Sequence, residues 1–300
     1  MALCTVLQSI GKLSLHISLV IGQPFEIQNC YSIGGGHINS NYRIEGAGQS
    51  YFVKINQPHC FEIFAAEAAG LAELAQPAVI KIPVPLCWGT TYHHAYLVME
   101  YITLRNDSQV SSAQLGHQLA VLHQVVKIPF GWYRNNYLGT VEQMNTLADS
   151  WVDFWRTNRL NYQLELASRK GYTGVLQTYG EQLSTDMHLF FANYTPLSSL
   201  LHGDLWAGNY GIDTQNQPVL FDPAVYYGDR EVDIAMTELF GGFPSRFYQA
   251  YQEEFPLDSG YAVRKKLYNL YYILNHLNTF GGGYLRQAEG MILGLLSELH

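Results

Sequence analysis

The chain has 300 residues, and 48% of them are hydrophobic while only 14% are charged. This composition can fill a sizeable core and excludes an intrinsically disordered chain. The net charge of −8 argues against a nucleic-acid-binding protein, because phosphate neutralisation requires clustered Lys and Arg side chains. One short basic cluster, Arg264-Lys265-Lys266, lies in a predicted helix, and we interpret it as a solvated helix face.

No stretch approaches the ~18 uninterrupted apolar residues of a membrane-spanning helix, so we expect no membrane partner. Polar residues such as Gln8 and Lys12 interrupt the apolar N-terminus and no A-x-A-like cleavage site follows it, so we expect no signal peptide. The four cysteines form no CxxC pair, and the sequence therefore indicates neither a zinc site nor a disulfide framework. Such a chain suits a reducing environment, and we expect a cytoplasmic protein.

The first hundred residues have the pattern of strands with one helix. Residues 42–44 and 51–55 are predicted to pair as strands around a turn at Gly46-Ala47-Gly48. Residues 61–74 are rich in Ala, Glu and Leu, which favours a helix. The apolar run at 95–100 predicts a short strand that is buried on both faces.

The pattern becomes helical after about residue 102, with one further strand predicted at 218–221. We therefore predict an α+β fold with a small β-rich lobe (1–102) and a large helical lobe (103–300). A short hinge just past Tyr101 would join them. The predicted helices of the second lobe are 114–126, 151–169, 231–240, 262–280 and 288–299.

The strongest motif is HGDLWAGN at residues 202–209, followed by an apolar run that ends at Asp222. Asp204 and Asn209 are five positions apart, which is the spacing of the protein-kinase catalytic loop. In that loop the aspartate accepts a hydrogen bond from the attacking hydroxyl and the asparagine holds magnesium. Asp222 can supply the second metal-holding carboxylate. We therefore predict a protein-kinase-like fold in which Asp204 is catalytic and Asn209 and Asp222 bind Mg²⁺.

A lysine and a glutamate in the small lobe complete this pattern. Lys54 lies between two apolar residues of a predicted strand, so it points to the opposite face from them. Glu67 lies thirteen residues later in the predicted helix, and such a Lys–Glu ion pair aims the ammonium at nucleotide phosphates in kinases. Glu73 is the alternative partner, but Glu67 shares the apolar face of the helix.

Three consecutive glycines, Gly34, Gly35 and Gly36, precede the first strand of this pair. Consecutive glycines let backbone N–H groups approach phosphates, so we predict that they bind the nucleotide. The run is not the G-x-G-x-x-G motif, and a flexible hairpin tip is the alternative interpretation.

Three acidic residues, Asp229, Glu231 and Asp233, lie at the start of a predicted helix. Negative side chains suit the positive end of a helix dipole, so we interpret them as capping residues. The alternative for Asp233 is that it braces the backbone of the catalytic loop.

The motifs HGDLWAGN, FDPAVYYGDREVDIAM, LFGGFPSRFYQAY and LNHLNTFG together resemble those of the fructosamine kinase (ketosamine 3-kinase) family. VKIN around Lys54, the helix FEIFAAEAAGL and the strand LVMEYI also match, so the resemblance covers essentially the whole chain. It implies ATP- and Mg²⁺-dependent phosphorylation of the sugar 3-hydroxyl of ketosamines, the rearranged adducts of sugars with amines. The phosphorylated adduct then becomes unstable and releases the amine, which constitutes deglycation.

Carried over by position, the resemblance gives Asp204, Asn209, Asp222 and Lys54 the roles predicted above. It also implies that the hinge residues Glu100, Tyr101 and Ile102 meet the adenine. We expect a ketosamine, small or protein-bound, as the substrate and a monomer or weak homodimer as the assembly. Many family members have a cysteine in the Gly-rich loop that is linked to redox-sensitive dimerisation, but this chain has His37 there.

Two residues are predicted to bind the sugar. Trp206 lies in the catalytic loop, and the C–H faces of sugars pack on aromatic rings. The resemblance places His276 near the same pocket, where it can hydrogen-bond a sugar hydroxyl. The alternative is that Trp206 anchors the core and that His276 is a buried histidine with its hydrogen bonds satisfied.

Other functions stay open from the sequence alone. An aminoglycoside-type or choline-type kinase would also carry the HGD motif, although an aminoglycoside site would need many acidic residues in the helical lobe. An inactive nucleotide-binding protein is the alternative outside the enzymes, against which the intact catalytic residues argue. A protein kinase is disfavoured, because the eleven positions from Asp222 to Asp233 leave no room for a long activation loop.

Overall fold

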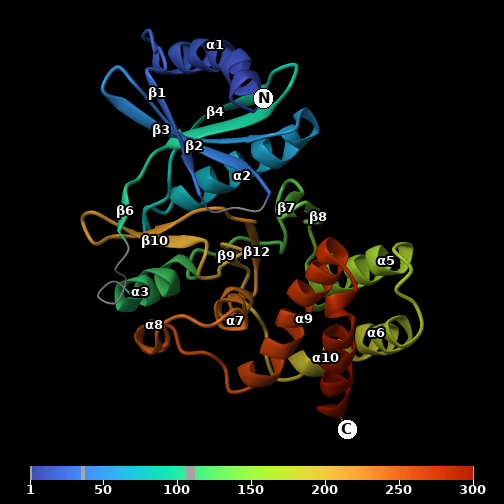
Figure 1. The fold of residues 1–300 in the computed structure, drawn as a ribbon. Helices are drawn as coiled ribbons and strands as arrows, with labels where there is room; N and C mark the ends of the chain where they lie inside the picture. Colours follow the sequence, from blue (N-terminus) through green and yellow to red (C-terminus); the bar gives the residue numbers. More distant parts are fainter. Residues whose placement is uncertain (1, 35–37, 106–111, 300) are drawn as a thin grey trace.

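The computed structural model describes residues 2–34, 38–105 and 112–299. Its N-terminal part is a five-stranded antiparallel sheet with the strand order β1-β2-β3-β5-β4 (Figure 1). The predicted strand pair forms β2 and β3, whose register places Tyr42 opposite Val53. The strands are β1 (Asn29–Ile33), β2 (Ser40–Gly46), β3 (Gln49–Asn56), β4 (Pro85–Thr90) and β5 (Ala95–Glu100).

Helices cover both faces of this sheet, α1 (Ala2–Ile21) on one and α2 (Phe61–Ala75) on the other (Figure 1). Side chains alternate across a strand, so β5 contributes to two separate cores. Leu97 packs in the cluster that contains residues of α2, while Val98 packs with Leu13 and Ile17 of α1. The prediction that residues 95–100 form a strand buried on both faces is therefore confirmed.

The expectation of a single helix in the first hundred residues was wrong, because α1 is a second one. Polar residues such as Lys12 and His16 interrupt its sequence, which weakens the apolar pattern. Leu13 and Ile17 are nevertheless one turn apart and buried, so contact with the sheet stabilises a helix that its own residues signal poorly. Strands β1 and β4 were not predicted either.

The C-terminal part is mostly helical, as predicted. The predicted helix at 151–169 is present but includes a π-helical segment, Arg156–Asn161, between α4 and α5. Helices α6 and α8 were not predicted. The α-helices are α3 (Ser112–Leu122), α4 (Trp151–Trp155), α5 (Tyr162–Arg169), α6 (Val175–Asp186), α7 (Glu231–Leu239), α8 (Ser245–Glu254), α9 (Tyr261–Phe280) and α10 (Leu285–Ser297).

Short strands frame the segment that carries the HGDLWAGN motif. The motif lies between β9 and β10, and Asp222 comes two residues after the end of β11. The antiparallel pairs β9–β12 and β10–β11 therefore bring the two chemical motifs to neighbouring strand ends. The short strands are β6 (Leu104–Arg105), β7 (Asn136–Leu138), β8 (Val141–Gln143), β9 (Ser199–Leu201), β10 (Tyr210–Asp213), β11 (Pro218–Leu220) and β12 (Tyr226–Gly228).

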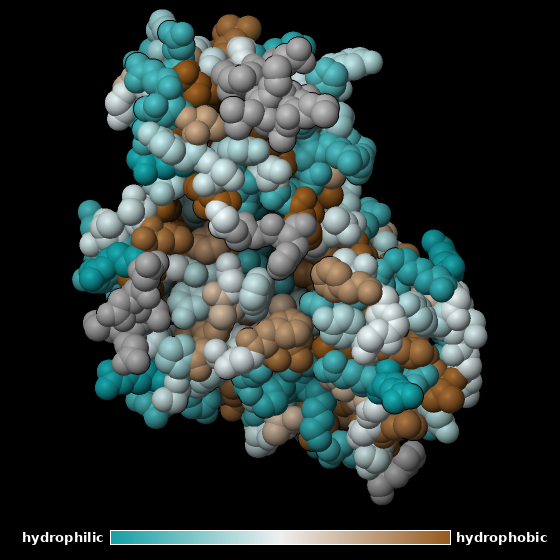
Figure 2. Space-filling view, viewed as in Figure 1, coloured by the Kyte–Doolittle hydropathy of each residue, from teal (hydrophilic) through white to brown (hydrophobic). Residues whose placement is uncertain are grey.

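Among the described residues, backbone contacts join the segments next to the sheet to the helical part. Strand β6 pairs with β10, just after the sheet ends at Glu100. The backbone N–H of Leu220 donates to the carbonyl of Lys81 at 3.1 Å. In Figure 2 hydrophobic residues are visible at the level of this junction and also over the helical part, among hydrophilic ones. The α+β, two-lobe fold is thus confirmed, whereas the exact boundary at residue 102 stays a prediction.

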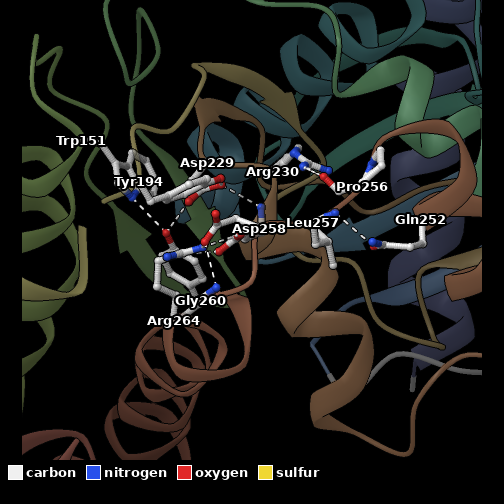
Figure 3. A network of polar contacts seen from close by, with 12 residues as sticks. Trp151, Tyr194, Asp229, Arg230, Gln252, Pro256, Leu257, Asp258, Gly260 and Arg264 are labelled. Carbon is white, nitrogen blue, oxygen red and sulfur yellow. Dashed lines mark hydrogen bonds and ion pairs between the residues drawn. The ribbon is translucent and has the colours of Figure 1, made fainter. Parts of the chain in front are cut away.

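A buried polar network ties the start of α7 to α9 (Figure 3). Asp229 accepts hydrogen bonds from the hydroxyls of Tyr268, at 2.5 Å, and Tyr194, at 3.0 Å. Arg264 forms ion pairs with Glu231 and Asp258. The interpretation of residues 264–266 as a solvated face was therefore wrong for Arg264, which is only 3% exposed. No helix within the described ranges is both long and apolar enough to cross a membrane.

Candidate active site

Asp233 fixes the backbone at the start of the HGDLWAGN loop. Its carboxylate accepts hydrogen bonds from the backbone N–H groups of His202, at 2.7 Å, and Gly203, at 2.8 Å. His123 Nε2 is 3.2 Å from the same carboxylate, and all these groups are fully buried. These bonds hold the pKa of Asp233 below its usual value despite its burial, so the carboxylate is charged. The bracing role is observed, and capping is left to Asp229, which accepts from the N–H of Glu231.

Gly203 is held on its other sides as well. Its φ is +82°, and an added Cβ would lie 2.0 Å from the carbonyl oxygen of Ala224. Only glycine fits such a position. The carbonyl of Gly203 accepts from the hydroxyl of Tyr272 on α9 at 3.0 Å. The loop backbone just before Asp204 is therefore fixed by α7, by α9 and by the segment that follows Asp222.

The imidazole of His202 links the two motifs. Its Nε2 lies 3.0 Å from the carbonyl oxygen of Phe221, which can only accept, so Nε2 carries the proton. Its Nδ1 is then free to accept from the N–H of Asp204 at 3.3 Å. Burial lowers the pKa of His202, which keeps the ring neutral in this arrangement.

The three residues predicted to carry the chemistry lie together. Asn209 Nδ2 donates to a carboxylate oxygen of Asp204 at 3.0 Å and to the backbone carbonyl of Asp204 at 2.8 Å. The same nitrogen is 3.4 Å from the backbone carbonyl of Asp222. Burial and the negative charge of Asp222 raise the pKa of Asp204 to about 7. A carboxylate with such a pKa is suited to accept a proton near neutral pH.

Asp222 also faces the small lobe. Lys54 Nζ lies 2.6 Å from Asp222 Oδ1 and 2.6 Å from Glu67 Oε1. Burial opposes the charge on Lys54, but the two carboxylates outweigh it and raise its pKa, so the lysine is an ammonium. Burial raises the pKa of Glu67 above its usual value, and the positive charge of Lys54 offsets only part of this shift. The lysine thus bridges the sheet, helix α2 and the end of β11 at a single point.

The alternative partner Glu73 lies elsewhere on α2. Its carboxylate accepts from the hydroxyl of Tyr227 at 2.8 Å and from the indole N–H of Trp132 at 3.3 Å. It holds the helical part against α2 and makes no contact with Lys54. The structure therefore favours Glu67 in the ion pair, as expected from its position on the apolar face.

Part of the predicted nucleotide-binding loop and all of the predicted hinge lie within the described residues. Gly34 is exposed directly after β1, and Gly35, Gly36 and His37 lie outside the described residues. At the far end of the loop, Asn56 Nδ2 donates to the carbonyl of Ile38 at 3.0 Å and thereby ties it to β3, two residues after Lys54.

At the predicted hinge, Glu100 ends β5, and Tyr101 and Ile102 follow it, all three partly buried. The guanidinium of Arg43 lies 4.6 Å from the centre of the Tyr101 ring, which steadies the hinge against β2.

The two predicted sugar-binding residues lie on different elements. The Trp206 side chain lies over Gly208 and is 39% exposed, so it is not a core anchor. His276 lies on α9, four residues after Tyr272, and is partly buried. Residues four apart share a helix face, so His276 lies on the face of α9 that contacts the catalytic loop. No hydrogen bond or ring contact joins Trp206 to His276 within the described part of the chain.

The oxygen donors of the site fit a hard cation. The Asp222 side chain is 45% exposed and lies close enough to Asp204 for its charge to raise the pKa of that residue. A divalent cation would relieve this repulsion, and Asn209 adds an amide oxygen. Among the described residues no group of three or more His, Cys, Asp or Glu side chains is arranged to hold a metal alone. Nucleotide phosphates and water usually complete a magnesium site.

Sequence reasoning missed the residues that contact His276 and Gly203. Phe240, Phe280 and Tyr284 form ring contacts with His276, and Tyr272 contacts Gly203. The spacing of four residues from Tyr272 through His276 to Phe280 was a readable signal of one helix face. Phe240 belongs to a distant segment, and nothing in the sequence indicated its contact with α9.

Comparison with known proteins places this geometry in a family. The family model described as fructosamine kinase matches residues 10–298. A probable ketoamine kinase of Synechocystis sp. is 46% identical over 282 residues, which cover 92% of this chain and 93% of that protein. A crystal structure assigned as a fructosamine-3-kinase from Haemophilus somnus is 31% identical with a TM-score of 0.88, covering 97% of this chain and 99% of that one.

A more distant likeness concerns the fold alone. A thermostable mutant of an aminoglycoside phosphotransferase has a TM-score of 0.62 at 14% identity, covering 95% of this chain and 98% of that one. The family match, in contrast, extends over nearly the whole chain and includes every described residue of the candidate site. The chain therefore belongs to the fructosamine kinase family.

Proposed function

We propose that this protein transfers the γ-phosphoryl group of ATP to the 3-hydroxyl of a ketosamine, with Asp204 as the proton acceptor. Membership of the family makes it a ketoamine kinase, a phosphotransferase that acts on a sugar hydroxyl. The observation that best supports the assigned roles is the single cluster in which Lys54 reaches Asp222 while Asn209 reaches Asp204. This cluster joins the phosphate-binding and the acceptor sides of the site.

The residues divide the chemistry between them. Asp204 orients the acceptor hydroxyl and takes its proton as the oxygen–phosphorus bond forms and the bond between the γ-phosphorus and the bridging oxygen of ADP breaks. Lys54, aimed by Glu67, neutralises the phosphates of ATP. Magnesium, held by Asn209 and Asp222, would supply further positive charge at the transferred group. The glycine run and the hinge residues Glu100, Tyr101 and Ile102 would hold the phosphates and the adenine.

The substrate class can be tested directly. ATP consumption should be measured against glycated lysine, ribulose-lysine and an aminoglycoside with the same enzyme preparation. Turnover with either ketosamine and none with the aminoglycoside supports the proposal. Turnover with the aminoglycoside alone would assign the chain to the alternative kinase class, and no transfer to any acceptor would favour an inactive nucleotide-binding protein.

Magnesium should bind tightly only together with the nucleotide, because two protein oxygen ligands form an incomplete coordination shell. Calorimetric titration of Mg²⁺ should therefore show weak binding to the free protein and much tighter binding in the presence of ADP. The Asp222→Asn variant should lose most of this difference. Phosphoryl transfer that persists in excess EDTA would contradict the assigned site.

Replacing Trp206 with alanine should raise the KM for the ketosamine about 10–100-fold and change the KM for ATP little. Burying such a ring against a sugar contributes a few kcal/mol at most, and ~1.4 kcal/mol corresponds to tenfold. Trp88→Ala is the matched control, because Trp88 on β4 is 40% exposed and Trp206 is 39% exposed. Equal losses for both substrates would show that Trp206 is structural.

A further inference from the structure

Four rings meet where α9 ends. The imidazole of His276 lies 5.0 Å from the ring of Phe240, 5.4 Å from Phe280 and 5.2 Å from Tyr284, measured between ring centres. The interplanar angles of these three pairs are 45–55°, so none of the three rings stacks face to face on the imidazole. We call Phe240, His276, Phe280 and Tyr284 the ring cluster.

The ring cluster is open to solvent, unlike most aromatic groups of the core. Phe280 is 64% exposed, and the other three side chains are partly exposed. Gly281, with a φ of +93°, ends the helix and turns the chain so that Tyr284 returns to His276. The rings therefore present part of their faces outward.

Two contacts join the segments that carry this cluster to the catalytic loop and to the strand that follows it. Tyr272, one turn before His276 on α9, donates to the carbonyl of Gly203. Phe243, three residues after Phe240, packs its ring 4.6 Å from that of Tyr210, which directly follows Asn209. A rise of about 1.5 Å per residue puts His276 only ~6 Å further along the helix than Tyr272. These contacts place His276 on the face of α9 that meets the catalytic loop, one turn beyond the residue that contacts Gly203.

The hydrogen bond of His276 within α9 uses only one of its two ring nitrogens. Its Nδ1 lies 2.8 Å from the carbonyl oxygen of Tyr272, so Nδ1 carries the proton in that hydrogen bond. In the neutral ring Nε2 then offers a lone pair. A group that donates a hydrogen bond to Nε2 would lie among three further aromatic rings.

We propose that the ring cluster binds the positively charged secondary amine of a ketosamine. This inference rests on the proposed function and specifies which part of the acceptor is recognised. An ammonium fits two features at once, because its N–H can donate to His276 Nε2 and its charge is attracted to the negative faces of aromatic rings. In a ketosamine the amine is attached to C1, two carbons from the reacting C3 position, so both groups can be engaged together.

Recognition by rings also suits a variable amine substituent. At such an open position, solvent would weaken the attraction between the ammonium and a carboxylate. Exposed rings offer apolar surface for the substituent as well as an electrostatic attraction for the charge. The remainder of the amine, whether a free amino acid or a protein side chain, can extend past Phe280 into solvent. A site of this kind recognises the positive charge of the ketosamine nitrogen and not the particular substituent that this nitrogen carries.

The test compares two acceptors that differ in this charge. One is the ketosamine of butylamine, and the other is its 1-O-butyl fructose analogue, which has the same shape but a neutral ether oxygen. We expect the wild-type protein to have a higher kcat/KM for the amine. Equal efficiency with both acceptors would overturn the ring-cluster inference but leave the proposed function intact. No turnover of either acceptor would overturn the proposed function itself.

Single variants assign the effect to the rings. Phe280→Leu and Tyr284→Leu should each lower the amine-to-ether ratio of kcat/KM about 2–5-fold, the size of an exposed cation–π contact. Tyr284→Phe keeps the ring and should keep the ratio, and so should Tyr133→Leu, since Tyr133 is an exposed ring on another surface, 67% exposed. Both acceptors are measured on one sample, so partial unfolding cancels. A ratio unchanged in both leucine variants of the cluster would refute the proposal.

Discussion

Replacing Asp204 with asparagine lowers kcat by at least about 10²-fold and leaves the affinity for ATP nearly unchanged. General-base contributions are typically about 10²–10⁴-fold, and the amide cannot take the proton of the acceptor hydroxyl. The new amide has nearly the same shape as the carboxylate and still fits beside Asn209. It keeps the hydrogen bond from Asn209 only if its oxygen faces the Asn209 nitrogen. Steady-state kinetics with a ketosamine and calorimetric titration with an ATP analogue measure the two quantities.

The matched control is Asp153→Asn, which removes an exposed carboxylate on α4 that pairs with Arg156. This change should alter kcat little, because solvent-exposed ion pairs contribute about 0–1 kcal/mol and Asp153 lies outside the site. A folded Asp204→Asn protein with near-normal turnover would remove Asp204 from the role of proton acceptor. Loss of ATP binding in the same variant would instead indicate a defect on the nucleotide side.

Much of the site was predictable because its residues are fixed by local patterns. The five-residue spacing of Asp204 and Asn209 and the strand that ends before Asp222 are visible in the sequence, and the structure brings all three together. The face on which Lys54 lies followed from strand alternation, and helical periodicity identified Glu67 as its partner rather than Glu73.

Contacts between distant segments could not be predicted in the same way. The role of Asp233 was open between capping and bracing, since both use an acidic residue at the start of a helix. Asp233 is 31 residues from His202 in sequence. Only the tertiary fold brings its carboxylate to 2.7 Å from the backbone nitrogen of His202. The contact of Phe240 with His276 has the same origin, because the position of one helix end against another depends on the packing of the entire lobe.

Arg264 and helix α1 show how packing can override a local pattern. Three consecutive basic residues are typical of a solvated face, yet Arg264 is buried because Glu231 offers it a bidentate carboxylate from α7. Helix α1 lacks clear sequence signals, yet Leu13 and Ile17 bury it on the sheet. In both cases the stabilising partner is remote, so composition alone gave the wrong or an incomplete expectation.

Replacing Asp233 with asparagine should lower both stability and kcat. The carboxylate is fully buried and accepts hydrogen bonds from two backbone N–H groups and from His123. An amide at this position has only one oxygen, so at least one of these donors would face the NH₂ group of the amide. A buried group left unpaired costs about 1–3 kcal/mol, and more where a charge is involved. Movement of the catalytic loop by about 1 Å can reduce turnover about 10²-fold. Thermal denaturation and kcat measured well below the melting temperature report the two effects.

His123→Gln separates loop positioning from stability. This variant removes one contact to Asp233 and the hydrogen bond to Tyr251, but it leaves both backbone N–H groups of the catalytic loop bound to the carboxylate. It should therefore melt at a lower temperature while kcat changes little, and the KM for ATP should stay normal in both variants because Lys54 and Glu67 are untouched. An Asp233→Asn protein that is destabilised yet turns over normally would show that Asp233 acts only on stability. The loop would then be positioned by its remaining anchors, which are the hydrogen bond from Tyr272 to the Gly203 carbonyl and the hydrogen bond from His202 to the carbonyl of Phe221, just after β11.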